Sequence, residues 1–155
     1  MAELGTAREA RGMVEVDRNG LEVLDRPTCL RLLDGTRLGR LGITSGALPT
    51  ILPINFRLVD ERIVFRTGVG TKLEAATSNA IVAFEVDDLD PLSHTGWSVV
   101  VTGLAHEVTD PEERERLDAG RLPFWAPSAG DRIVAISTEM ISGRRILPAV
   151  HPTPR

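Results

Sequence analysis

One short segment of the chain gathers residue types that can bind an anion. Lys72 is the only lysine among the 18 lysines and arginines, and it follows residues 68–71, Gly-Val-Gly-Thr. Glycines let the backbone approach a ligand closely, and a helix that begins here presents free N–H groups to an anion. Arg66 adds a fork of donors, and the hydroxyls of Thr67 and Thr71 add two more. The segment therefore predicts a phosphate site.

The spacing of this segment argues against the common nucleotide-binding motifs. The P-loop places four residues between its first glycine and Gly-Lys-Ser/Thr, and the dinucleotide fingerprint reads Gly-x-Gly-x-x-Gly. Neither pattern occurs at residues 65–72. ATP and a Rossmann-bound NAD are therefore disfavoured. A solvent-exposed loop whose lysine pairs with a carboxylate is the alternative interpretation.

The chain offers few residues for direct catalysis. His94, His106 and His151 match neither the His-x-x-x-His nor the Glu-x-x-His spacing of metal pairs, so no metal site is predicted. No Gly-x-Ser-x-Gly elbow occurs, and Cys29 is interpreted as a buried thiol in a structural helix. The absence of an acid, a base and a nucleophile suits an enzyme whose organic cofactor supplies the chemistry.

Length and composition narrow the class of protein. A chain of 155 residues fits one domain, and a net charge of −4 argues against nucleic acid as a partner. A single cysteine builds no disulfide framework, which fits a reducing cytoplasm. No run approaches the roughly 20 apolar residues of a membrane span, and residues 1–20 lack the apolar core of a signal peptide. We therefore expect a cytoplasmic protein with no membrane partner.

Most of the chain reads as short strands. Asp25 and the proline at position 27 predict the start of a helix that ends at Gly35. Strand-like runs follow at 37–44, 49–59, 62–67, 80–87, 97–108 and 132–138. Residues 59–62 can form a tight polar turn, so the second and third runs are expected to pair as a hairpin.

Two more short helices are expected. Thr71 is a candidate N-cap with Glu74 at the capping-box position, and a helix after Asp110 is expected to stop at Gly120. Six strands with two or three helices predict a mainly β fold, a barrel with helical additions. Residues 1–20 are expected to form a flexible arm, 21–147 the folded domain and 148–155 a flexible tail.

Four motifs occur in a fixed order along the domain. They are Leu-Pro-Ile-Asn-Phe at 52–56, Ile-Val-Phe-Arg-Thr-Gly at 63–68 with Lys72, Gly-Trp-Ser-Val-Val-Val-Thr-Gly at 96–103, and Ile-Ser-Gly-Arg-Arg at 141–145. Their order and spacing resemble the pyridoxamine 5'-phosphate oxidase-like superfamily of flavin-binding split barrels, including its nitroimidazole-resistance-type reductases. The resemblance implies a six-stranded split β-barrel of Greek-key type that forms a homodimer, with FMN sites built from both chains.

The resemblance also implies the residues that bind the cofactor. The strand that meets the isoalloxazine ring is matched by Pro53, Ile54 and Asn55. The phosphate positions are matched by Arg66, Thr67 and Lys72, with Phe65 and Thr71 in the same segment. Ser98 matches a position where relatives present a glutamine, and a serine is shorter. The partner chain is expected to contribute the loop around Trp125 and Arg144.

The implied function is an oxidoreductase. We expect hydride transfer from NAD(P)H to FMN and electron transfer to a small acceptor such as a nitroaromatic, a quinone or a flavin. Pyridoxamine phosphate oxidation is not the first choice, because the basic residues that hold pyridoxal phosphate are not evident near the C-terminus. Three alternatives remain: a deazaflavin-dependent reductase, a haem-binding or haem-degrading barrel that uses His94 or His106, and a non-catalytic flavin store or sensor.

Overall fold

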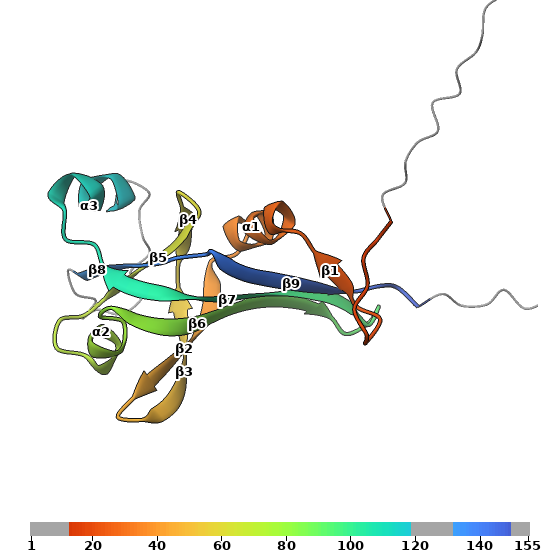
Figure 1. Cartoon of the computed structure of the whole chain (residues 1–155), viewed down its shortest axis with the longest axis horizontal. Helices are drawn as coiled ribbons and strands as arrows, with labels where there is room; N and C mark the ends of the chain where they lie inside the picture. The colour runs from red at the N-terminus through yellow and green to blue at the C-terminus, as the bar shows by residue number, and fades with distance from the viewer. Residues whose placement is uncertain (1–12, 119–131, 150–155) are drawn as a thin grey trace, which may run out of the picture.

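The computed structural model describes residues 13–118 and 132–149, which form one antiparallel sheet with three helices (Figure 1). The strands are β1 (Glu22–Leu24), β2 (Leu38–Ser45), β3 (Leu48–Asn55), β4 (Arg57–Val59), β5 (Arg62–Thr67), β6 (Ala80–Asp90), β7 (Thr95–Glu107), β8 (Arg132–Ile136) and β9 (Met140–Ile146). The helices are α1 (Arg26–Asp34), α2 (Lys72–Ala76) and α3 (Pro111–Asp118).

The sheet curls because its two ends are consecutive in the chain. Its order is β3-β2-β6-β7-β8-β5-β4, and β9 pairs with both β7 and β1. Since β4 follows β3 after one residue, the first and last strands of this order lie next to each other in sequence, as a half-barrel requires. The predicted mainly β fold is confirmed.

The predicted count of six strands is wrong, because the described residues contain nine strands. The expected run at 49–59 divides at Phe56, whose N–H donates to the carbonyl of Arg37 at 3.0 Å. The preceding segment then pairs with β2 and the following one with β5. The other two strands, β1 and β9, had no clear alternating pattern in the sequence.

The predicted turn between β4 and β5 is confirmed. Val59 pairs with Arg62, and the two residues between them have φ values of 50° at Asp60 and 58° at Glu61. Positive φ at both central positions is the geometry that matches the twist of paired strands. The hairpin ends at the Arg57–Val64 pair, so its strands separate before Asn55 and Arg66.

The starts of α1 and α3 follow the sequence prediction, and an aspartate caps each of them. Asp25 Oδ1 accepts the N–H of Thr28 at 2.9 Å at the start of α1, and Gly35 follows its last residue. Asp110 Oδ2 accepts the N–H of Glu113 at 3.0 Å at the start of α3. The predicted stop at Gly120 lies outside the described residues. Within the described ranges, none of the helices is long and apolar enough to cross a membrane.

The inner face of the sheet packs under α1 (Figure 1). Cys29 and Leu33 of α1 are buried with Phe84 and Val99 of the sheet. Burial raises the pKa of the Cys29 thiol, which fits the predicted structural role. A Cβ at Gly143 would lie 2.6 Å from the Cys29 sulfur, so the helix sits on β9 only because this residue is glycine.

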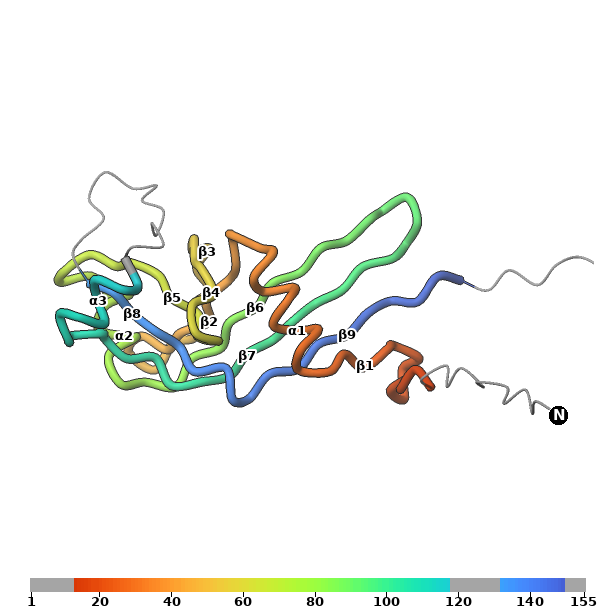
Figure 2. Tube along the Cα trace, turned by 90° about the horizontal axis from the view of Figure 1, so that it is seen from above, coloured from red at the N-terminus to blue at the C-terminus, as the bar shows by residue number. Residues whose placement is uncertain are grey.

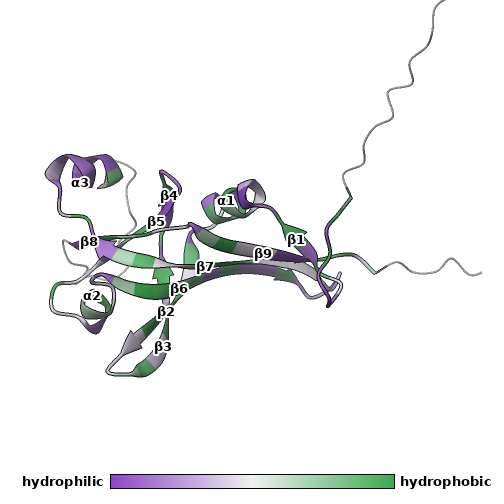
Figure 3. Ribbon diagram, in the orientation of Figure 1, coloured by the Kyte–Doolittle hydropathy of each residue, from purple (hydrophilic) through white to green (hydrophobic). Residues whose placement is uncertain are grey.

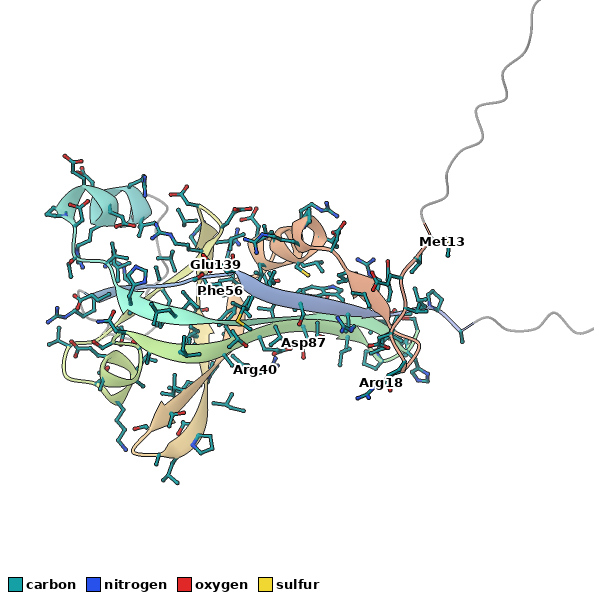
Figure 4. The ribbon with its side chains drawn as sticks, in the orientation of Figure 1. Met13, Arg18, Arg40, Phe56, Asp87 and Glu139 are labelled. Carbon is teal, nitrogen blue, oxygen red and sulfur yellow. The ribbon has the colours of Figure 1, made fainter. Side chains whose placement is uncertain are left out.

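The opposite face, here called the outer face, carries exposed apolar side chains. It is formed by the outward residues of β3, β2, β6, β7 and β9. Its large apolar members are Leu38, Ile51, Ile81, Leu89, Val100, Leu104, Met140 and Ile146. Figure 3 shows hydrophobic and hydrophilic stretches alternating along these strands, and Figure 4 shows Arg40 and Asp87 on the side away from α1. Exposed apolar patches of this kind are typical of surfaces that contact another molecule.

Residues at the N-terminal end of the described chain pack on the domain. Residues 15–23 form a small hairpin closed by the Val16–Glu22 bridge, and Asp17 contacts Arg144 of β9 at 2.9 Å. Residues 1–12 of the predicted arm and 150–155 of the predicted tail lie outside the described residues.

A glycine pair tests the packing of the sheet. A Cβ on Gly103 would overlap the carbonyl oxygen of Ser137, whereas a Cβ on Gly42 would meet its nearest atom at 3.5 Å, an ordinary contact. We expect Gly103→Ala to reduce the free energy of unfolding by about 2 kcal/mol through overpacking, as measured by urea denaturation. Gly42→Ala is the matched control and should leave stability within about 0.5 kcal/mol. Equal effects of the two changes would contradict this account of β7.

Candidate functional site

A chain of hydroxyls shapes the predicted phosphate segment. Thr67, the last residue of β5, is 3% exposed, and its Oγ1 lies 3.2 Å from Thr71 Oγ1. Thr71 Oγ1 donates to the Gly68 carbonyl at 2.9 Å and accepts the N–H of Glu74 at 3.0 Å. Because Thr71 uses its proton on Gly68, Thr67 is the donor in the shared bond. The turn between β5 and α2 is therefore held by the last side chain of β5 and by the side chain that caps α2.

Glu74 completes this turn in a way that the sequence did not predict. Thr71 caps α2 as expected, but the Glu74 carboxylate accepts the N–H of Gly70 instead of the N–H of Thr71. Gly70 has a φ of 75°, which favours glycine and lets its N–H turn toward Glu74. The turn thus holds a carboxylate already, bound to its backbone.

Arg132 is the basic residue that the sequence analysis missed. It pairs in register with Thr67 and lies at the start of β8. Its Nε lies 3.2 Å from Glu74 Oε1, and its Nη1 donates to Glu107 Oε1 at 2.6 Å. The guanidinium therefore joins α2 to β7 and β8 beside the hydroxyl chain. Pairing the predicted strands 62–67 and 132–138 would have brought it to this position.

The other predicted phosphate residues are distributed around the end of β5. Successive strand residues point to opposite faces, so Arg66 leaves β5 on the side of Val64 and Ile133, away from Thr67. Phe65 is buried in the inner core and can offer only its backbone. Lys72 is exposed at the first residue of α2, next to the turn. The structure therefore brings together Thr67, Thr71 and the start of α2, with Arg132 in addition.

The residues expected at the ring lie on the outer face, with one exception. Pro53 and Asn55 of β3 face outward, as do Ser98 of β7 and Arg144 of β9, which are paired with each other. Ile54 points into the core, so only its backbone could meet a ligand. Trp125 lies outside the described residues.

Charged groups on the outer face are paired within the chain. Arg40 Nη1 donates to Glu85 Oε2 at 3.0 Å and lies 3.4 Å from Asp87 Oδ1. Partial burial, with help from nearby Asp87, raises the pKa of Glu85, although Arg40 acts in the opposite direction. Arg144 is paired with Asp17. Internal pairing lowers the cost of covering this face with another surface.

The outward residues expected at the ring form two groups that lie far apart in one chain, one on β3 and the other on β7 and β9. Pro53, Arg40, Glu85 and Val100 are successive partners across β3, β2, β6 and β7. These three strand spacings amount to roughly 14 Å. Figures 1 and 2 agree that α2 and β1 lie toward opposite ends of the molecule. The α2 turn therefore lies far from the Arg144 end of β9, where β1 pairs.

The donor set fits a phosphate group and shows no metal chemistry. Two threonines, a lysine and an arginine belong to this turn or adjoin it, and donors of these types suit a phosphate once they exchange their internal bonds for bonds to it. No group of three His, Cys, Asp or Glu within residues 13–118 and 132–149 is arranged to hold a metal ion. His94 is exposed in the β6–β7 turn, and His106 is half-buried on β7.

Comparison with known proteins gives consistent matches. Residues 25–145 match the family described as pyridoxamine 5'-phosphate oxidase. The chain is 45% identical over 129 residues to an uncharacterized protein of Mycobacterium tuberculosis, covering 80% of this chain and 84% of that one. The solved structure of the FAD binding protein from Mycobacterium smegmatis has a TM-score of 0.71 and 35% identity, covering 81% of this chain and 99% of that one. A conserved protein of unknown function from Corynebacterium diphtheriae has a TM-score of 0.69 and 32% identity, with 82% and 98% covered.

The contacts of Arg132 predict a structural effect that can be measured. Arg132→Gln removes the ion pairs with Glu74 and Glu107, so we expect a loss of about 1 kcal/mol in the free energy of unfolding and faster amide exchange in α2. Arg116→Gln is the control, because Arg116 and Asp60 form a more exposed pair at 3.3 Å. Unchanged exchange in α2 would show that Arg132 does not hold the turn.

Proposed function

Because the chain belongs to the pyridoxamine 5'-phosphate oxidase family, as its motifs predict, we propose that it binds a flavin nucleotide and acts as an oxidoreductase. The observation that carries the proposal is the hydroxyl-bonded turn between β5 and α2. Lys72 adjoins this turn, and Arg132 supports it.

The phosphate group is the part of the flavin that the α2 turn would bind. A flavin phosphate carries close to two negative charges, and charge-assisted hydrogen bonds contribute about 1.5 to 3 kcal/mol each. Lys72 supplies the exposed positive charge, while the hydroxyls of Thr67 and Thr71, whose protons are bonded to Thr71 and to the Gly68 carbonyl, would turn toward the phosphate to donate to it. A phosphate at the Gly70 N–H would compete with the Glu74 carboxylate, which then remains paired with Arg132.

Two flavins fit this arrangement. FMN is the cofactor that the sequence motifs imply. FAD is the second candidate, because the 35% identical protein of Mycobacterium smegmatis is described as an FAD binding protein. Both contain a phosphate on the ribityl chain, so the same turn can serve either one.

The reaction in this proposal is one that the cofactor, and not a side chain, would carry out. The flavin would supply two-electron chemistry, taking hydride from NAD(P)H and passing electrons to a small acceptor such as a nitroaromatic, a quinone or a free flavin. The described residues of the chain would bind and orient it: the α2 turn would hold the phosphate, and the outward residues of β3 would contact the ring. Pro53 and Asn55 are the outward residues in question.

The functional unit is a homodimer in this proposal. Exposed apolar residues on the outer face favour contact with a second copy, and the charges between them are already paired. The roughly 14 Å between the Pro53 and Val100 positions supports the same arrangement, because one ring then meets β3 of one chain and β7 and β9 of the other.

Removal of the lysine tests the anchor. We expect Lys72→Ala to weaken binding of added flavin at least tenfold, about 1.4 kcal/mol, in a fluorescence titration. Arg31→Ala on α1 is a charge-matched control away from the site and should bind flavin normally. Equal affinity of Lys72→Ala and wild type would contradict the assignment.

The ligand that co-purifies tests the identity of the cofactor. Mass spectrometry separates FMN from FAD, and two visible absorption bands support a flavin. A single shifted band would favour a deazaflavin, and a Soret band after haem addition would favour haem; either result contradicts the proposal. Bound flavin with no NAD(P)H oxidation in the presence of an acceptor panel would favour storage or sensing over catalysis.

A further inference from the structure

The hairpin of residues 15–23 brings an acidic residue to the outer face. The N–H of Val23 donates to the carbonyl of Glu15 at 2.8 Å, and the N–H of Asp17 donates to the carbonyl of Leu21 at 2.9 Å. Val23 of β1 also pairs with Arg144 of β9. The turn of the hairpin is thereby fixed beside Arg144.

The two oxygens of Asp17 have separate roles. Oδ1 accepts the N–H groups of Asn19 at 2.8 Å and Leu21 at 3.1 Å, which shapes the turn. Oδ2 accepts Nε–H of Arg144 at 2.9 Å. The backbone bonds from Leu21 and Asn19, followed by Arg144, hold the pKa of Asp17 below its usual value. The carboxylate is therefore charged at neutral pH, and the contact is lost only in acid.

Arg144 is consequently held in one orientation. Nε is bound by Asp17, and Nη1 donates to the Gly143 carbonyl at 2.9 Å. Its position opposite Ser98 puts it on the outer face, in the group that would meet a flavin held by a second copy. A guanidinium fixed in this way loses less side-chain entropy when it binds a ligand.

We propose that Asp17 is a positioning residue of the flavin site, acting through Arg144 on the cofactor anchored by the partner chain. The inference rests on the proposed function and extends the site to the N-terminal hairpin. Arg144 presents its remaining N–H donors to an electron-rich group of the bound flavin, and Asp17 keeps them aimed there.

The variant Asp17→Asn isolates this contact. Asparagine keeps an Oδ1 acceptor for the turn but replaces Oδ2 with an amide that cannot accept Nε–H. Glu22→Gln is the matched control, because Glu22 Oε2 of β1 accepts Nη1–H of Arg145 of β9 at 3.1 Å, beside the Asp17–Arg144 contact but on the opposite face of the sheet. We expect flavin to bind Asp17→Asn about fivefold to tenfold more weakly and Glu22→Gln within about twofold of wild type.

A double-mutant cycle separates positioning from a general structural role. Asp17→Asn should have no further effect on flavin affinity in an Arg144→Ala background. Arg144→Lys, which keeps the charge but lacks the Nε–H, should reproduce the weakening and serves if Asp17→Asn fails to fold. Wild-type affinity in Asp17→Asn, or an equal loss in both backgrounds, would overturn this inference alone. Absence of flavin binding by the wild-type protein would overturn the proposed function as well.

Discussion

The alternation of side chains across one curled sheet is the constraint on which the rest of the structure depends. Inward residues such as Phe84 and Val99 are fully buried under α1, and outward residues such as Ile51 and Met140 remain uncovered. A sheet with one filled face and one apolar open face favours association. The cofactor residues implied by the sequence divide along the same lines, since Asn55 and Ser98 face outward and Ile54 faces inward.

Local chemistry predicted the parts of the fold that local contacts stabilise. The Asp25 cap, the turn at 59–62 and the Thr71 cap each involve residues within a few positions of one another. The short β1 and the weakly patterned β9 depend on pairing with distant strands, which no local pattern reports. The division of the predicted run at Phe56 likewise depends on a distant residue, because the N–H of Phe56 donates to the carbonyl of Arg37, which directly precedes β2.

The candidate site shows the same limit. The motif around Lys72 was visible in sequence, but Arg132 reaches the turn only through the register of β8 against β5. Asp17 lies 127 positions from Arg144 and was assigned to a flexible arm. Because successive strand residues face opposite sides, the sequence could have shown that Arg66 and Thr67 point away from each other. The motif favoured grouping them, because both residues match phosphate positions. Sequence motifs therefore predicted the kind of ligand, whereas strand pairing determines which side chains lie together.

The central claim is that each flavin lies between two chains, with its phosphate on the α2 turn of one and its ring near Ser98 and Arg144 of the other. Flavin stoichiometry in a mixed dimer tests it most directly: Lys72→Ala and Arg144→Ala chains with different tags are co-expressed, and the dimer carrying both tags is titrated. The account predicts one wild-type site and one doubly defective site, so half of the wild-type flavin binds with normal affinity. Two weakened sites with no normal one would mean that a single chain supplies both halves, which would contradict the account.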